Sequence, residues 1–125
     1  MDREILFRGK RTDNGEWVLG LLARYNSNFE TANMVNELGI LIPVLSSTVG
    51  QYTGLTDKNG KKIFEGDIVI LRFNPCVVKW DSDNACYALY QNSITKVSGF
   101  NADTMKLLEV IGNIHDNPEL IKQEC

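Results

Sequence analysis

The sequence predicts a mainly β protein, either a small antiparallel barrel or a strongly coiled sheet, with one or two short helical turns. An SH3-like barrel element is compatible with the same pattern. The first observation is that glycine and short Asn/Asp/Gly clusters recur about every ten residues, as expected for short strands joined by tight turns. The second is that several short apolar runs lie between these turns, which favours an antiparallel arrangement over a βαβ layout.

In the first third of the chain, we predict strands over 4–8, 16–22 and 39–45. Asp13, Asn14 and Gly15 predict a tight turn between the first two strands, because Asn and Gly tolerate positive φ. Residues 23–34 are polar and show no period, so we predict a mobile loop or an excursion of the chain there.

The middle of the chain has the clearest alternation of strand and turn signals. We expect strands over 49–55, 61–64, 68–73, 76–80 and 85–90. Turns are predicted at the Asn59–Gly60 hairpin tip, at 65–67, at Asn74–Pro75, which should stop the preceding strand, and at 81–84.

Near the C-terminus the apolar spacing fits both a helix and a strand. We favour a helical turn near 102–106 followed by a strand over 107–114. Asn117, Pro118 and Glu119 then predict a short helix, with Asn as the N-cap and Pro at the first helical position.

Composition limits the class of protein. The chain has 125 residues, which fits one domain over 1–125. Hydrophobic residues make up 43% and charged residues 23%, which excludes global disorder. The net charge of −3 excludes a domain that is basic overall, and the single histidine excludes a multi-histidine metal site.

The N-terminal segment and the cysteines predict a location in the bacterial cytosol. The first apolar run is three residues long, Ile5 to Phe7, and charged residues flank it, so it is no signal peptide. No run approaches the ~18 apolar residues that span a bilayer, and we expect no membrane contact. Cys76, Cys86 and Cys125 form an odd, widely spaced set that suits a reducing compartment, and we expect the first two to pack as small hydrophobes on strands.

No arrangement of residues in the sequence predicts catalysis, a metal or a cofactor. His115 is the only imidazole and has no nucleophile beside it in sequence. Asp81, Asp83 and Asn84 begin like a calcium loop that then lacks its glycine and its final acidic residue, so we interpret them as a turn. Glu65 and Asp67 are interpreted as turn residues, with Asp67 bonding backbone amides. An enzyme that acts through Glu65, Asp67 or His115 remains an alternative.

Two basic groups lie at or beside predicted hairpin ends. They could contact phosphates if the two ends point the same way, with Trp17 and Tyr52 adding stacking surface. A nucleic-acid-binding β module is therefore the second functional hypothesis. The basic residues are Arg8, Lys10, Arg11, Lys58, Lys61 and Lys62.

Three predicted strands are apolar without alternation, over 19–22, 39–45 and 68–71. Continuous apolar runs indicate that both faces of a strand are covered. One short helix cannot shield three strands, so we predict a homo-oligomer. Pro43 cannot donate to a ladder, which predicts an edge or bulged strand there and a plausible contact between copies.

Four phrases of the sequence together resemble the YopX family of phage and prophage proteins from Gram-positive bacteria. They are REILFRGK at 3–10, GEWVLG at 15–20, VGQYTGLTDKNGKKIFEGDIV at 49–69 and EVIGNIHDNPEL at 109–120. The resemblance implies one compact, mostly β fold with no activity or catalytic residues to transfer.

The resemblance also implies that the signature residues define the fold. We therefore expect a non-enzymatic phage accessory protein that associates with itself and acts by protein contacts. The structural motif residues are Gly50, Gln51, Tyr52, Gly60, Glu65, Gly66 and Asp67.

Overall fold

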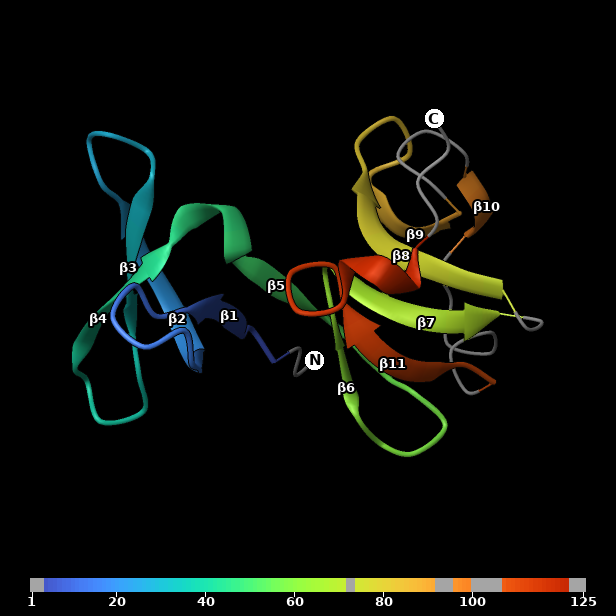
Figure 1. Cartoon of the computed structure of the whole chain (residues 1–125), viewed down its shortest axis with the longest axis horizontal. Coiled ribbons are helices and arrows are strands. Elements are labelled where there is room, and N and C mark those ends of the chain that lie inside the picture. The colour runs from blue at the N-terminus through green and yellow to red at the C-terminus, as the bar shows by residue number, and fades with distance from the viewer. Residues whose placement is uncertain (1–3, 72–73, 92–95, 100–106, 122–125) are drawn as a thin grey trace. The chain divides into compact units, whose positions relative to one another are not determined.

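The computed structural model describes residues 4–71, 74–91, 96–99 and 107–121. The chain divides into two compact units, Met1–Tyr52 and Thr53–Cys125, which are described one at a time (Figure 1). Both are built from antiparallel strands, which confirms a mainly β fold. The assignment of 1–125 to a single domain stays a prediction.

The first unit is one curled antiparallel sheet in the order β4-β3-β2-β1-β5. An isolated bridge between Arg11 and Val44 brings the chain beyond β1 to the outer edge of β4. Its core contains Val18, Ala32, Met34, Ile42 and Val44. The strands are β1 Phe7–Lys10, β2 Trp17–Tyr25, β3 Thr31–Val35, β4 Leu41–Leu45 and the first part of β5 Gly50–Thr56, with a 3-10 turn at Ser46–Thr48.

The prediction of a mobile loop over 23–34 is wrong. Strand β2 continues to Tyr25, and β3 begins at Thr31. The polar residues between them form a hairpin turn, in which Asn28 Oδ1 accepts the N–H of Glu30 at 2.9 Å. In β3, the buried residues Ala32 and Met34 alternate with half-buried residues that point outward. This alternation is short and lies within a mostly polar stretch of sequence, so it does not stand out as a strand signal.

Strand β4 lies at the edge of this sheet, as the proline within it predicts. The N–H of Thr12 donates to the carbonyl of Pro43 at 3.2 Å, from the side away from β3. In an antiparallel pair, the nitrogen and carbonyl of one residue point to the same side. The nitrogen of Pro43 therefore also points away from β3, and no hydrogen bond of the β3–β4 ladder is lost.

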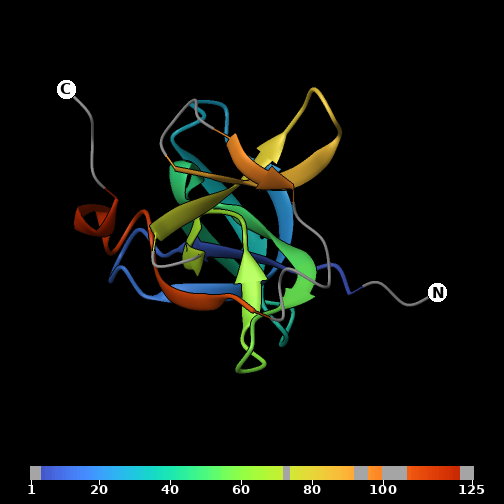
Figure 2. The same ribbon diagram turned by 90° about the vertical axis from the view of Figure 1, so that its right-hand side faces the viewer.

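The second unit contains the end of β5, its partner β6, and a sheet in the order β10-β9-β8-β7-β11. A cluster that includes Ile63, Val69, Val78 and Leu89 forms its core. The hairpins β5–β6 and β8–β9 project as loops (Figure 1 and Figure 2). The strands are β6 Lys62–Phe64, β7 Asp67–Leu71, β8 Asn74–Asp81, β9 Cys86–Tyr90, β10 Lys96–Gly99 and β11 Glu109–Asn113.

Two of three local predictions for this unit can be compared with the described residues. A 3-10 turn over Pro118–Leu120 follows Asn117, which confirms a short helical turn there. Strand β7 ends at Leu71, before the Asn74–Pro75 pair, but the turn predicted at this pair is wrong because β8 begins at Asn74. Proline is tolerated at the start of a strand. The helical turn predicted over 102–106 lies outside the described residues.

The structure supports two antiparallel sheets, and neither closes into a barrel over the described residues. The barrel alternative is therefore not confirmed. The single bridge at Arg11 curls the first sheet without continuing as a ladder.

Candidate functional site

The first unit presents an apolar surface on the side of the sheet opposite its core. Along β2, buried Val18 alternates with exposed Leu19 and Leu21, and along β4, buried Ile42 alternates with exposed residues. The strand register places Leu21, Val35 and Leu41 in one row across three strands. We call this surface the outer face; its members are Leu19, Leu21, Val35, Leu41, Pro43 and Leu45.

The outer face is open to solvent in the single chain. Leu21 is 52% exposed and Leu41 is 59% exposed. Leu38 and Ile40, in the turn between β3 and β4, are also exposed. Together the exposed leucines of this face contribute on the order of 400 Å², which lies within the range of the largest apolar patches of typical monomers. Apolar patches of this size commonly mark interaction sites.

A cationic aromatic cluster borders the outer face. The guanidinium of Arg8 lies 4.7 Å from the centre of the Trp17 ring, and the ammonium of Lys10 lies 5.6 Å from it. Arg8 is the register partner of Leu19, and Lys10 of Trp17, so the cluster continues the same face onto β1. Both distances are within the range of cation–π attraction.

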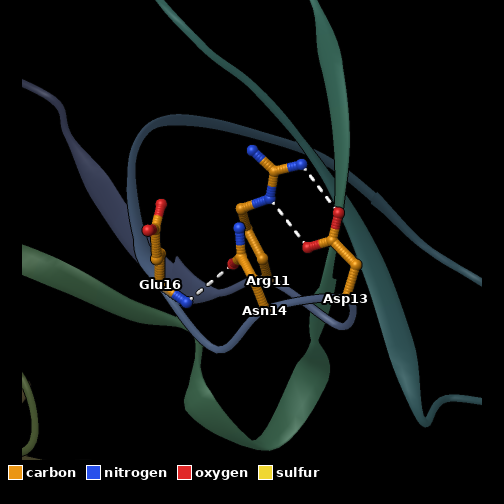
Figure 3. A network of polar contacts seen from close by, with 4 residues as sticks. All are labelled: Arg11, Asp13, Asn14 and Glu16. Carbon is orange, nitrogen blue, oxygen red and sulfur yellow. Dashed lines mark hydrogen bonds and ion pairs between the residues drawn. The ribbon is translucent and has the colours of Figure 1, made fainter.

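The third basic residue of this group is neutralised locally. Arg11 Nε and Nη2 donate to the two carboxylate oxygens of Asp13 at 2.9 and 2.8 Å (Figure 3). This hydrogen-bonded pair raises the pKa of Arg11 and lowers the pKa of Asp13. Asn14 Oδ1 accepts the N–H of Glu16 at 2.9 Å, which fixes the turn beside the pair. Arg11 therefore offers less free charge to a phosphate than its sequence position indicates.

The second basic group lies at the β5–β6 hairpin, in the other unit. Lys58 forms an ion pair with Glu109, with Nζ and Oε1 3.4 Å apart, and Lys61 is exposed. Because the two groups belong to different units, their convergence into one patch stays a prediction.

Asp57 holds the β5–β6 hairpin to β11, and sequence analysis missed this role. Its side chain is buried, with Oδ1 accepting the N–H groups of Asn59 and Lys61 at 2.8 and 2.9 Å. Oδ2 accepts the N–H of Val110 at 2.9 Å, from a residue 53 positions away. Burial alone would raise the pKa of Asp57, but the backbone donors and the charge of Lys61 outweigh it and lower that pKa.

The signature residues lie in turns and buried backbone positions. Gly60 and Gly66 adopt φ of +80° and +92°, where side chains other than glycine are strained. Tyr52 is buried, and its N–H donates to the carbonyl of Leu6 at 2.8 Å. Asp67 is buried, and its Oδ2 accepts the N–H of Phe64 at 2.7 Å, a backbone contact of the kind expected for this residue.

The remaining signature residues lie in the same two segments. Gly50 and Gln51 are the register partners of Arg8 and Phe7 in β1. Glu65 precedes Gly66 in the turn between β6 and β7.

Candidate acid–base residues come near one another along the backbone of the second unit. Asp67 is the register partner of Asn113, and Ile114 N–H donates to the carbonyl of Gly66 at 3.0 Å. The turn at 65–67 therefore lies beside the segment that carries His115, whose own N–H donates to Asn113 Oδ1 at 3.0 Å. Within the described ranges, no group of three or more His, Cys, Asp or Glu side chains could hold a metal ion.

Cys76 is placed as a core residue rather than as a reactive thiol. Cys76 is buried in the second core, and this burial raises the pKa of its thiol, which keeps the thiol protonated. Cys86 is half-buried, and both are free thiols. Cys125 lies outside the described residues.

Comparison with known proteins identifies the family. A family model described as YopX protein matches residues 6–122, nearly the whole chain. The chain belongs to the YopX family. No curated protein matches it.

A solved structure shares the fold of this YopX chain. The crystal structure of protein EF1440 from Enterococcus faecalis matches with a TM-score of 0.65 and 21% sequence identity. The match covers 97% of this chain and 100% of that chain, so the likeness extends over both units. Over the part of the YopX chain that the structure describes, no helix has the length and apolar content to cross a membrane.

Proposed function

We propose that this YopX-family chain is a non-enzymatic accessory protein of a phage or prophage, which associates with itself in the host cytosol and acts by protein contacts. The family membership supports the phage setting through the resemblance described above. The observation that carries self-association is the exposed apolar outer face of the first unit.

The contrast between the two units strengthens this proposal. In β7 of the second unit, Ile68 and Val69 point to opposite faces of the sheet and are both fully buried. The chain therefore covers both faces of that apolar strand itself. In β2 and β4 of the first unit, by contrast, the side chains on one face of the strand are buried and the apolar side chains on the other face are exposed. A second copy is the simplest cover for the exposed set, because exposed apolar surface otherwise favours aggregation.

Light scattering coupled to size exclusion tests the proposal. At micromolar concentration we expect a mass that is a whole multiple, at least two, of the 14.1 kDa chain. Burial of apolar area drives association, so the multimer should persist in high salt. A particle of 14.1 kDa at every concentration tested would contradict self-association.

Nucleic-acid binding is the second candidate, favoured by the cluster of Arg8, Lys10 and Trp17. Cations beside an aromatic ring can contact phosphates and stack on bases. If this candidate holds, the protein is retained on immobilised DNA or RNA at low salt. Retention should fall as salt rises and should fall again in a variant with Arg8 and Lys10 both changed to Glu. A variant with Lys58, Lys61 and Lys62 all changed to Glu tests the second basic group in the same way. No retention at low salt would remove this candidate.

A further inference from the structure

We infer that the outer face of the first unit packs against the same face of a second copy of this chain. This inference rests on the proposed function and names the surface that performs it. Its central row is Leu21, Val35 and Leu41, and a two-fold axis near this row would bring each copy's row onto the other.

The area of the outer face fits a partner of this kind. The exposed leucines of the outer face supply on the order of 400 Å², and a standard interface buries roughly 800 Å² on each partner. Val35, Pro43 and the bordering Trp17 lie on the same face and add to this area, as do the polar residues at its border. A sheet face also packs readily on another sheet face, because its side chains stand in regular rows that interdigitate.

The distribution of charge on this face also fits a partner interface. The central rows on β2, β3 and β4 carry aliphatic residues and proline, with neutral Thr31 and Asn33 between them. Charged residues lie at the border: Arg8 on β1, and Arg24, which is the register partner of Asn33 at the far end of β2. An apolar centre with a charged rim is the usual anatomy of a protein interface.

The decisive experiment changes the centre of the face without touching the core. In the double variant Leu21→Glu with Leu41→Glu, both substituted side chains are exposed, so folding should be retained. We expect the dissociation constant of the multimer to rise by about 100-fold or more, because four carboxylates would meet at one symmetric interface. The matched control is Leu107→Glu, a residue of the second unit that is 79% exposed, and it should keep the wild-type mass.

Light scattering gives the mass of each variant and circular dichroism shows whether it is folded, so together they test the interface and the self-association separately. A folded double variant that keeps the multimeric mass overturns the outer face as the interface, while the proposed self-association stands. A monomeric wild-type protein overturns self-association itself. If both the double variant and Leu107→Glu have the mass of a monomer, association does not depend specifically on the outer face, and the inference is contradicted.

A second measurement applies if the double variant fails to fold. A photo-crosslinking benzophenone amino acid placed at Leu41 leaves the core intact, because this side chain is 59% exposed. We expect intermolecular cross-links to residues 17–45 of another copy, located by mass spectrometry. Cross-links only to residues 53–121, whether of the same or another copy, would show that the second unit covers this face and would overturn the inference.

Discussion

Replacing Asp57 with alanine is expected to lower the free energy of unfolding by about 4 kcal/mol. The change removes a carboxylate that accepts three backbone N–H groups and leaves the buried N–H of Val110 without an acceptor. Hydrogen bonds to charged groups contribute roughly 1.5–3 kcal/mol each, and their losses within one network do not add fully. Urea denaturation followed by far-UV circular dichroism would measure the loss.

The pH dependence gives this prediction a signature of its own. Because the folded pKa of Asp57 lies below its ordinary value of 3.8, its contribution is complete above that value and is lost as pH falls through the folded pKa. The wild type should therefore lose stability below about pH 4 more steeply than Asp57→Ala. Asp83→Ala, a change at an exposed turn aspartate, serves as control and should alter stability little. Equal losses in the two variants would contradict the role of Asp57.

Gly20→Ala is expected to destabilise the first unit by about 3 kcal/mol or more, or to prevent its folding. A Cβ at this position would lie 2.0 Å from the carbonyl oxygen of Val35, which is backbone and cannot rotate away. Strand β3 would have to move from β2, and the core side chains Ala32 and Met34 would move with it. Thermal unfolding monitored by circular dichroism measures this effect.

The matched control for this prediction is Gly15→Ala. Gly15 adopts φ of +73° and has open space around it, so alanine there meets only backbone strain of about 1 kcal/mol. A loss for Gly20→Ala no larger than for Gly15→Ala would show that β2 and β3 can separate at this point without cost.

Local signals predicted several of the turns of this fold. The Asn59–Gly60 tip and the turn around Gly66 were predicted because a positive φ restricts the residue to glycine or a few polar types. The edge position of Pro43 follows from its missing donor in the same way. Such features depend on neighbours in sequence, and the sequence shows those directly.

Long-range partners were beyond the reach of the same reasoning. The third hydrogen bond to Asp57 is donated by the backbone N–H of Val110, and no local sequence pattern predicts a donor so far along the chain. The hairpin around 26–30 was missed because its strands reach into polar sequence, where only Ala32 and Met34 mark the buried face.

The candidate site was predicted only in part. The apolar runs predicted that both faces of certain strands are buried. From sequence alone, however, the runs Ile68–Leu71 and Leu19–Leu22 cannot be told apart. The structure distinguishes them, since Ile68 is fully buried and Leu21 is half exposed. The basic residues were found by composition, while the pairing of Arg11 with Asp13 and of Lys58 with Glu109 emerged only from the geometry.

The proline in β4 has a consequence for strand addition at this edge of the sheet. An incoming strand that tried to extend the sheet at this margin would find no amide hydrogen at Pro43, and a carbonyl already occupied by Thr12. Strand-by-strand addition, the route to open-ended fibrils, is therefore obstructed at this margin. If copies of this chain associate through the outer face as proposed above, that contact is satisfied once two surfaces have covered each other and does not continue along this margin.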